Sequence, residues 1–93
     1  MKRRRGMNWK DVFADIFELP KDIMLDMPRL VLIGNLQLFL ENHRGIIEYG
    51  EQKIRIAVGN GEIAVCGKGL QIRTLLSRDL SIEGEIEGII YEE

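Results

Sequence analysis

Apolar residues alternate with polar ones along the last two thirds of this 93-residue chain, from Leu30 to Tyr91. Alternation with a period of two places successive side chains on opposite faces of a strand. Gly or Asn falls wherever a hairpin would turn. The pattern predicts an antiparallel β-meander of about seven short strands over residues 29–91, curled or roll-like, with one apolar face. The alternative is a short β-solenoid, in which the same strands pair differently and Gly occupies the corners.

The turns follow from the residues between the strands. Asn60-Gly61 is typical of a type I′ turn and would pair Val58 with Ile63. Further turns are expected at 34–35, 42–45, 50–51, 67–69 and 77–79. A slip of one residue at any turn reverses all later faces, so one consistent inner face supports the meander. That predicted face comprises Val31, Ile33, Leu36, Leu38, Leu40, Ile47, Tyr49, Ile54, Ile56, Val58, Ile63, Val65, Leu70, Ile72, Leu76, Leu80, Ile82, Ile86 and Ile90.

The segment before the strands has helical spacing. Asn8 is a good N-cap, and Pro20 removes a backbone donor, so an amphipathic helix is predicted over residues 8–19. Its apolar stripe is Trp9, Val12, Phe13, Ile16 and Phe17. Residues 1–7 are expected to be a flexible basic tail, and residues 20–28 an extended connector. The chain is therefore predicted to be one domain over 8–93, mainly β and α+β only by count of one helix.

Charge and cysteine content limit the classes of function. The net charge of −2 includes the positive charges of Lys2, Arg3, Arg4 and Arg5, so the rest of the chain is acidic. Such a body disfavours a broad nucleic-acid surface. The single cysteine, Cys66, allows no internal disulfide and fits a reducing cytoplasm. No apolar run approaches the roughly 20 residues of a membrane span, so membrane contact is expected only peripherally or through a partner.

The residues that could carry chemistry are isolated. His43 is expected to be a solvated turn residue, and Cys66 a small packing residue. Glu83, Glu85 and Glu87 are expected to form a solvated face of an edge strand. No catalytic, cofactor-binding or metal-binding residue is predicted, and the chain is not expected to be an enzyme.

The proportions of the predicted fold favour an interaction role. A helix of about 12 residues is roughly 18 Å long, whereas seven strands span roughly 29 Å, so one helix cannot cover a flat sheet. The first hairpin would carry a second apolar patch on its outer face, at Leu30, Leu32, Phe39 and nearby Ile46. We predict that this patch is a partner or self-association surface. The alternative is an anionic-lipid or nucleic-acid contact through Lys2, Arg3, Arg4 and Arg5.

Several short sequences along the strands form a recognisable set. They are Ile46-Ile47-Glu48-Tyr49, Ile54-Arg55-Ile56, Gly61-Glu62-Ile63, Val65-Cys66-Gly67, Gly69-Leu70-Gln71-Ile72 and the ending Ile82-Glu83-Gly84-Glu85-Ile86-Glu87-Gly88-Ile89. This set resembles the YabP/YqfC family of sporulation proteins. The segments 9–20 and 41–45 resemble the YqfC branch in particular. The resemblance implies a role in endospore formation, in the mother-cell cytoplasm or at the forespore membrane. It also implies a protein partner, with the membrane protein YqfD as the candidate, and carries over no catalytic residues.

Overall fold

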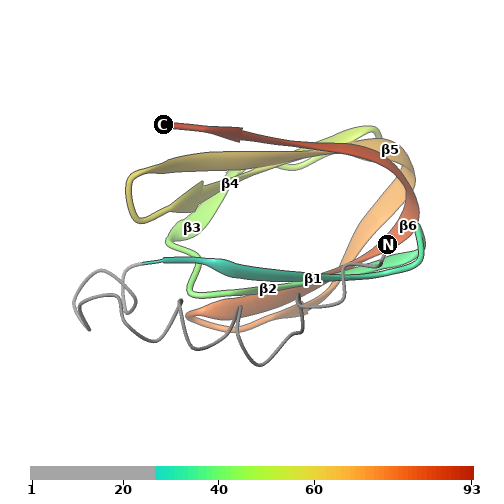
Figure 1. Ribbon diagram of the computed structural model, residues 1–93. Coiled ribbons are helices and arrows are strands. Elements are labelled where there is room, and N and C mark those ends of the chain that lie inside the picture. The colour runs from blue at the N-terminus through green and yellow to red at the C-terminus, as the bar shows by residue number, and fades with distance from the viewer. Residues whose placement is uncertain (1–26) are drawn as a thin grey trace, which may run out of the picture.

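The computed structural model describes residues 27–93, which form one antiparallel sheet of six strands (Figure 1). The predicted tail (1–7), helix (8–19) and most of the connector lie outside the described residues. The strands are β1 (Arg29–Ile33), β2 (Gln37–Glu41), β3 (Gly45–Glu48), β4 (Lys53–Val58), β5 (Gly61–Leu75) and β6 (Asp79–Glu92). Their order in the sheet is β1-β2-β6-β5-β4-β3. The prediction of a mainly antiparallel β fold is confirmed.

The predicted meander and its solenoid alternative are both wrong. β2 pairs with β6 instead of β3, so Leu40 lies opposite Leu80. The sheet is open, and β1 and β3 are the end strands of its order. The predicted order fails because the turn over 42–45 is not a hairpin. Residues 42–44 instead carry the chain across to the other end of the sheet.

The two longest strands, β5 and β6, form a curved ribbon that organises the fold. β5 has 15 residues because the turn predicted at 67–69 does not form, and the strand bends there without ending. Figure 1 shows β5 and β6 curving together through this bend. Register shifts interrupt their pairing near Cys66/Gly67 and between Lys68 and Gln71. Such bulges increase local bending, which allows one ribbon to serve two layers.

Glycine is required where the two curved strands approach each other. A Cβ on Gly84, which has φ +142°, would lie 2.7 Å from the carbonyl oxygen of Gly69. A Cβ on Gly67 would lie 2.0 Å from the carbonyl oxygen of Glu85. At Gly84 and Gly67 the other backbone therefore leaves no room for a side chain. At Gly88 a Cβ would meet nothing within 4 Å.

The bend divides the sheet into two facing layers. The upper layer contains β3, β4, residues 61–66 of β5 and residues 86–92 of β6. The lower layer contains β1, β2, residues 70–75 of β5 and residues 79–83 of β6. One apolar cluster fills the space between them: Leu38, Leu40, Ile54, Ile56, Val58, Ile63, Val65, Leu70, Leu80, Ile82 and Ile86. All eleven residues belong to the predicted inner face.

Other parts of the predicted inner face are wrong, because the registers differ at the turns and bulges. The first hairpin turns through three residues, so Leu32 lies opposite Leu38 and Val31 opposite Phe39. Val31 and Ile33 therefore lie on the outer face, whereas Leu30 packs against the core. The bulge near Gly88 has the same effect, and Ile89 contacts the core in place of Ile90. Leu36, Ile47, Tyr49 and Leu76, also predicted inside, are exposed.

The hairpin between β4 and β5 turns one residue earlier than predicted. Val58 pairs with Gly61 and Ile56 with Ile63, so Gly59 and Asn60 form the connection. Asn60 lacks the positive φ that a type I′ turn needs. The register differs from the predicted one by two residues, which preserves both faces. The core side chains of these strands are therefore those predicted.

Candidate functional site

The loop between β2 and β3, residues 42–44, joins the two layers through backbone hydrogen bonds. The His43 N–H donates to the Arg78 carbonyl oxygen at 2.9 Å, in the turn between β5 and β6. The next amide, of Arg44, donates to the Ala57 carbonyl oxygen at 2.7 Å, in β4. Asn42 enters the loop with φ 69°, a left-handed conformation that Asn tolerates better than most residues. The crossing between layers is therefore fixed at both of its ends.

The His43 side chain reinforces this junction. The prediction that it is a solvated turn residue is wrong. Its exposed fraction is 3%. Nδ1 accepts from the Gly45 N–H at 3.0 Å, and Nε2 lies 2.9 Å from the Leu76 carbonyl oxygen. Because that carbonyl can only accept, Nε2 carries the proton. Both ring nitrogens are engaged by the backbone, so the arrangement is structural, and no spacing in the sequence signals it.

The four residues of the predicted interaction surface do not share one face. Leu30 and Ile46 are partly buried and pack against the core. Leu32 is half-exposed on the inner face of the lower layer, opposite Leu38. Phe39 points outward and is exposed. Of these four residues, only Phe39 is therefore exposed on the outer face.

An apolar patch does lie on the outer face of the first hairpin, but with different members. Val31 and Phe39 are cross-strand partners, and Ile33 is two residues further along the same face. Their exposed fractions are 37%, 39% and 53% for Val31, Phe39 and Ile33. We call these three residues the hairpin patch. The sequence could not identify it, since Leu30 to Ile33 is an unbroken apolar run in which either face can point inward.

A second apolar feature is a cleft of about 420 Å³ where β3 of the upper layer lies near the end of β5 in the lower layer. Ile46 and Tyr49 line it from the upper layer, and Ile72, Arg73 and Leu75 line it from the lower one. Tyr49 and Leu75 are more than half exposed. The two layers thus remain open along this side.

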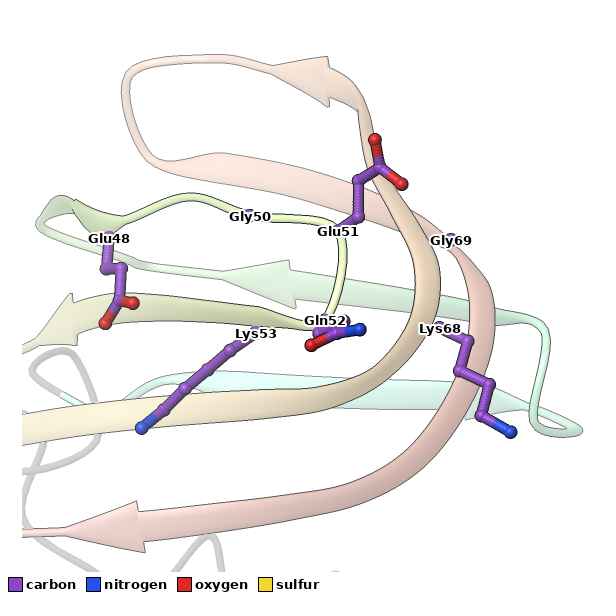
Figure 2. Close-up of a pocket in the computed structure, with 7 residues that line it drawn as sticks. All are labelled: Glu48, Gly50, Glu51, Gln52, Lys53, Lys68 and Gly69. Carbon is purple, nitrogen blue, oxygen red and sulfur yellow. The ribbon is translucent and has the colours of Figure 1, made fainter.

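A polar hollow of about 430 Å³ lies where the β3–β4 loop meets the bend of β5. Glu48, Glu51, Gln52, Lys53 and Lys68 line it together with two glycines. Figure 2 shows Lys53 and Lys68 extending away from each other, with Glu51 pointing away from both. Since the charged groups do not converge, the hollow lacks the arrangement that anion binding or acid–base chemistry would need.

Two carboxylates of β6, Glu83 and Glu87, are engaged in ordinary surface pairs, and Glu85 is exposed. Glu83 accepts from Gln37 Nε2 at 3.4 Å and lies 3.7 Å from the Arg73 guanidinium. Glu87 lies 3.7 Å from Lys68 Nζ. The prediction that these acids line an edge strand is wrong at Glu83, because β2 pairs with β6 as far as this residue.

Among residues 27–93, the shortest ion pair lies on the outer face of the upper layer. Arg55 donates to both carboxylate oxygens of Glu62, at 2.7 and 2.8 Å, and to Glu48 at 3.4 Å. The hydrogen bonds from Arg55 lower the pKa of Glu62, and those to Glu62 and Glu48 raise the pKa of Arg55. The bidentate geometry fixes the β4–β5 hairpin and leaves neither group available for chemistry.

The remaining features concern metals, membranes and the tail. Among residues 27–93, no group of three or more His, Cys, Asp and Glu side chains could hold a metal ion. Within the same residues, no helix is long and apolar enough to cross a membrane. The Cys66 thiol is free and half-buried. Lys2, Arg3, Arg4 and Arg5, the predicted anionic contact, lie outside the described residues, so their role stays a prediction.

The fold and its surfaces define a small antiparallel β protein with two exposed apolar features and structurally engaged polar groups. Comparison with known proteins places it more narrowly: the YabP family model matches residues 26–93, so the chain belongs to the YabP family. It is 34% identical over 76 residues to the uncharacterized protein YqfC of Bacillus subtilis strain 168, covering 82% of each chain. The family is associated with sporulation, and the predicted resemblance is confirmed.

Proposed function

We propose that this protein is a non-enzymatic sporulation protein that acts by binding another protein through the hairpin patch. The observation that carries the proposal is the exposure of Val31, Ile33 and Phe39 side by side on the outer face of β1 and β2. The core on the inner face of this hairpin is already filled by Leu38 and Leu40. A contiguous apolar group on the opposite face is typical of a protein interaction site.

The state of the polar residues supports binding in preference to catalysis. A general acid or base needs an accessible group beside a pocket. His43 is buried with both nitrogens hydrogen-bonded. The cleft beside β3 is lined by four apolar or aromatic side chains and by Arg73, which is not an acid–base group at neutral pH.

The partner we propose is a membrane protein made during endospore formation. Family resemblance gives YqfD as the candidate, and the hairpin patch offers it an apolar contact. Such a complex would bring the protein to the forespore membrane from the mother-cell cytoplasm.

Co-purification from sporulating cells tests this proposal. Tagged protein, full length, should co-purify with YqfD from detergent-solubilised membranes. Phe39→Lys and Ile33→Lys should each reduce the recovered YqfD at least tenfold, because each places a charge in the apolar contact. Gln52→Lys is the control, since Gln52 is an exposed residue of the β3–β4 loop and lies outside β1 and β2.

Folding of each variant is checked by circular dichroism before binding is compared. Equal YqfD recovery with the Phe39→Lys variant and the Gln52→Lys control would remove the hairpin patch from the proposal. Failure of the unmodified protein to recover YqfD would remove YqfD as the partner.

A further inference from the structure

The strands at the two edges of each layer run in opposite directions, which allows antiparallel strand addition at either edge. Each layer contains four strands, and all neighbouring strands are antiparallel. The two edge strands of such a layer therefore run in opposite directions. In the upper layer the edges are β3 and residues 87–92 of β6. In the lower layer they are residues 71–75 of β5 and β1.

These four edges lack a further strand partner within residues 27–93. β4 pairs with β5 only as far as Cys66, and backbone bonds from Gly67 and Leu70 to the β3–β4 loop end this contact. On β6, the Gly84 and Ile86 amides donate to carbonyl oxygens at the tip of the first hairpin. Beyond Ile86, and within the described residues, this edge of β6 makes no further backbone hydrogen bond to another strand. Unpaired edges of this kind are templates for strand addition.

The edges fall on two opposite sides of the molecule. β5 lies on the same side of β6 before and after the bend. In the upper layer β4 and β3 lie beyond β5 on that side, so β3 and residues 71–75 of β5 share one side of the molecule, which we call the β3 side. β1 and residues 87–92 share the other, the β1 side; Figure 1 shows β1 and the end of β6 nearest the viewer, with the lower part of β5 behind. The apolar cleft between the layers lies on the β3 side.

The core reaches the surface on both sides. Leu75 lies opposite the core residue Leu80, so its side chain points between the layers on the β3 side, yet it is 55% exposed. On the β1 side, Leu32 lies opposite Leu38, and Tyr91 lies opposite Ile63. Both are nearly half exposed. Within the described residues, apolar side chains that face the core are thus left uncovered at both sides.

We propose that copies of this chain associate head to tail, with the β1 side of one copy against the β3 side of the next. Copies in the same orientation keep every new strand contact antiparallel, in both layers, and the apolar core continues from copy to copy. A two-fold dimer through the β3 side would bring two copies of Arg73 together and would leave Leu32 and Tyr91 uncovered on the β1 side, whereas head-to-tail contact covers both sides.

This inference rests on the proposal that the protein works through protein–protein contacts, but it uses different surfaces. Analytical ultracentrifugation of the purified full-length chain tests it. The average mass should rise with concentration beyond that of a dimer. Leu75→Glu blocks the β3 side, and Leu32→Glu blocks the β1 side, so each variant alone should be monomeric. Mixed in equal amounts, the two variants should form a dimer and nothing larger, because one intact side of each kind remains.

The mixing result separates head-to-tail association from a two-fold dimer, in which the two variants could not complement each other. Gln52→Glu, a change of an exposed loop residue, is the control and should associate like the unmodified chain. If Leu75→Glu fails to fold by circular dichroism, Tyr49→Glu replaces it, since Tyr49 lines the same cleft. A monomeric unmodified chain, or a mixture that stays monomeric, would overturn the inference. YqfD recovery by such a monomer would leave the proposed function standing.

Discussion

Replacing His43 with alanine should destabilise the protein far more than a loop substitution usually does. His43 is 3% exposed, with both ring nitrogens hydrogen-bonded to backbone atoms. A net hydrogen bond contributes about 1 kcal/mol, and a buried donor left without a partner costs about 1–3 kcal/mol. The Gly45 N–H is half-buried and would lose its acceptor. We therefore expect His43→Ala to lower the free energy of unfolding by about 2–4 kcal/mol.

Urea unfolding followed by far-ultraviolet circular dichroism measures this loss. Ser77→Ala, an exposed substitution in the adjoining turn, is the control and should change stability by less than about 0.5 kcal/mol. His43→Asn should recover about half of the loss, because the Asn side-chain oxygen can accept from the amide two residues on. The shorter Asn side chain cannot reach the Leu76 carbonyl oxygen, so that hydrogen bond is lost. A loss below about 0.5 kcal/mol for His43→Ala, at an unchanged denaturant slope, would refute the assigned role.

Two further substitutions test the bend and the surface ion pair. Gly84→Ala should destabilise by at least about 2 kcal/mol, because it combines strained backbone with a backbone clash, whereas Gly88→Ala should change the same urea midpoint little. Equal effects would contradict the close approach in β6. Glu62→Gln should cost stability at neutral pH, and this difference should shrink as pH falls below about 4, because the folded-state pKa of Glu62 is lowered by Arg55 and its stabilisation is lost on protonation. A difference that stays constant from pH 7 to pH 3 would exclude an ionic contribution.

Side-chain alternation predicted the core where the two faces of a strand differ in polarity. In β4, Ile54, Ile56 and Val58 alternate with Lys53, Arg55 and Ala57, and only one face can be buried at low cost. The same holds for Ile63 and Val65 in β5. Even the misplaced turn at Asn60 left these faces correct, since its register error was an even number of residues.

The interaction surface was harder to predict for the opposite reason. Residues 30–33 and 46–47 are apolar on both faces, so their polarity does not select a register. A three-residue turn in place of a two-residue one then exchanged Leu30 and Leu32 for Val31 and Ile33 on the outer face. Bulges acted similarly later in the chain, where one extra residue in β6 placed Ile89 inward instead of Ile90.

The sequence by itself determined that this chain forms antiparallel strands, and its predicted inner face contains all eleven side chains of the core, because burial of alternate residues is a local property. Tertiary structure alone decided which strands pair, since many pairings satisfy the same alternation. It made β5 and β6 one curved ribbon, placed His43 inside the junction of the layers and, within residues 27–93, left the core open at the β3 and β1 sides. These outcomes depend on contacts between residues far apart in the chain, such as Leu40 with Leu80 and His43 with Leu76.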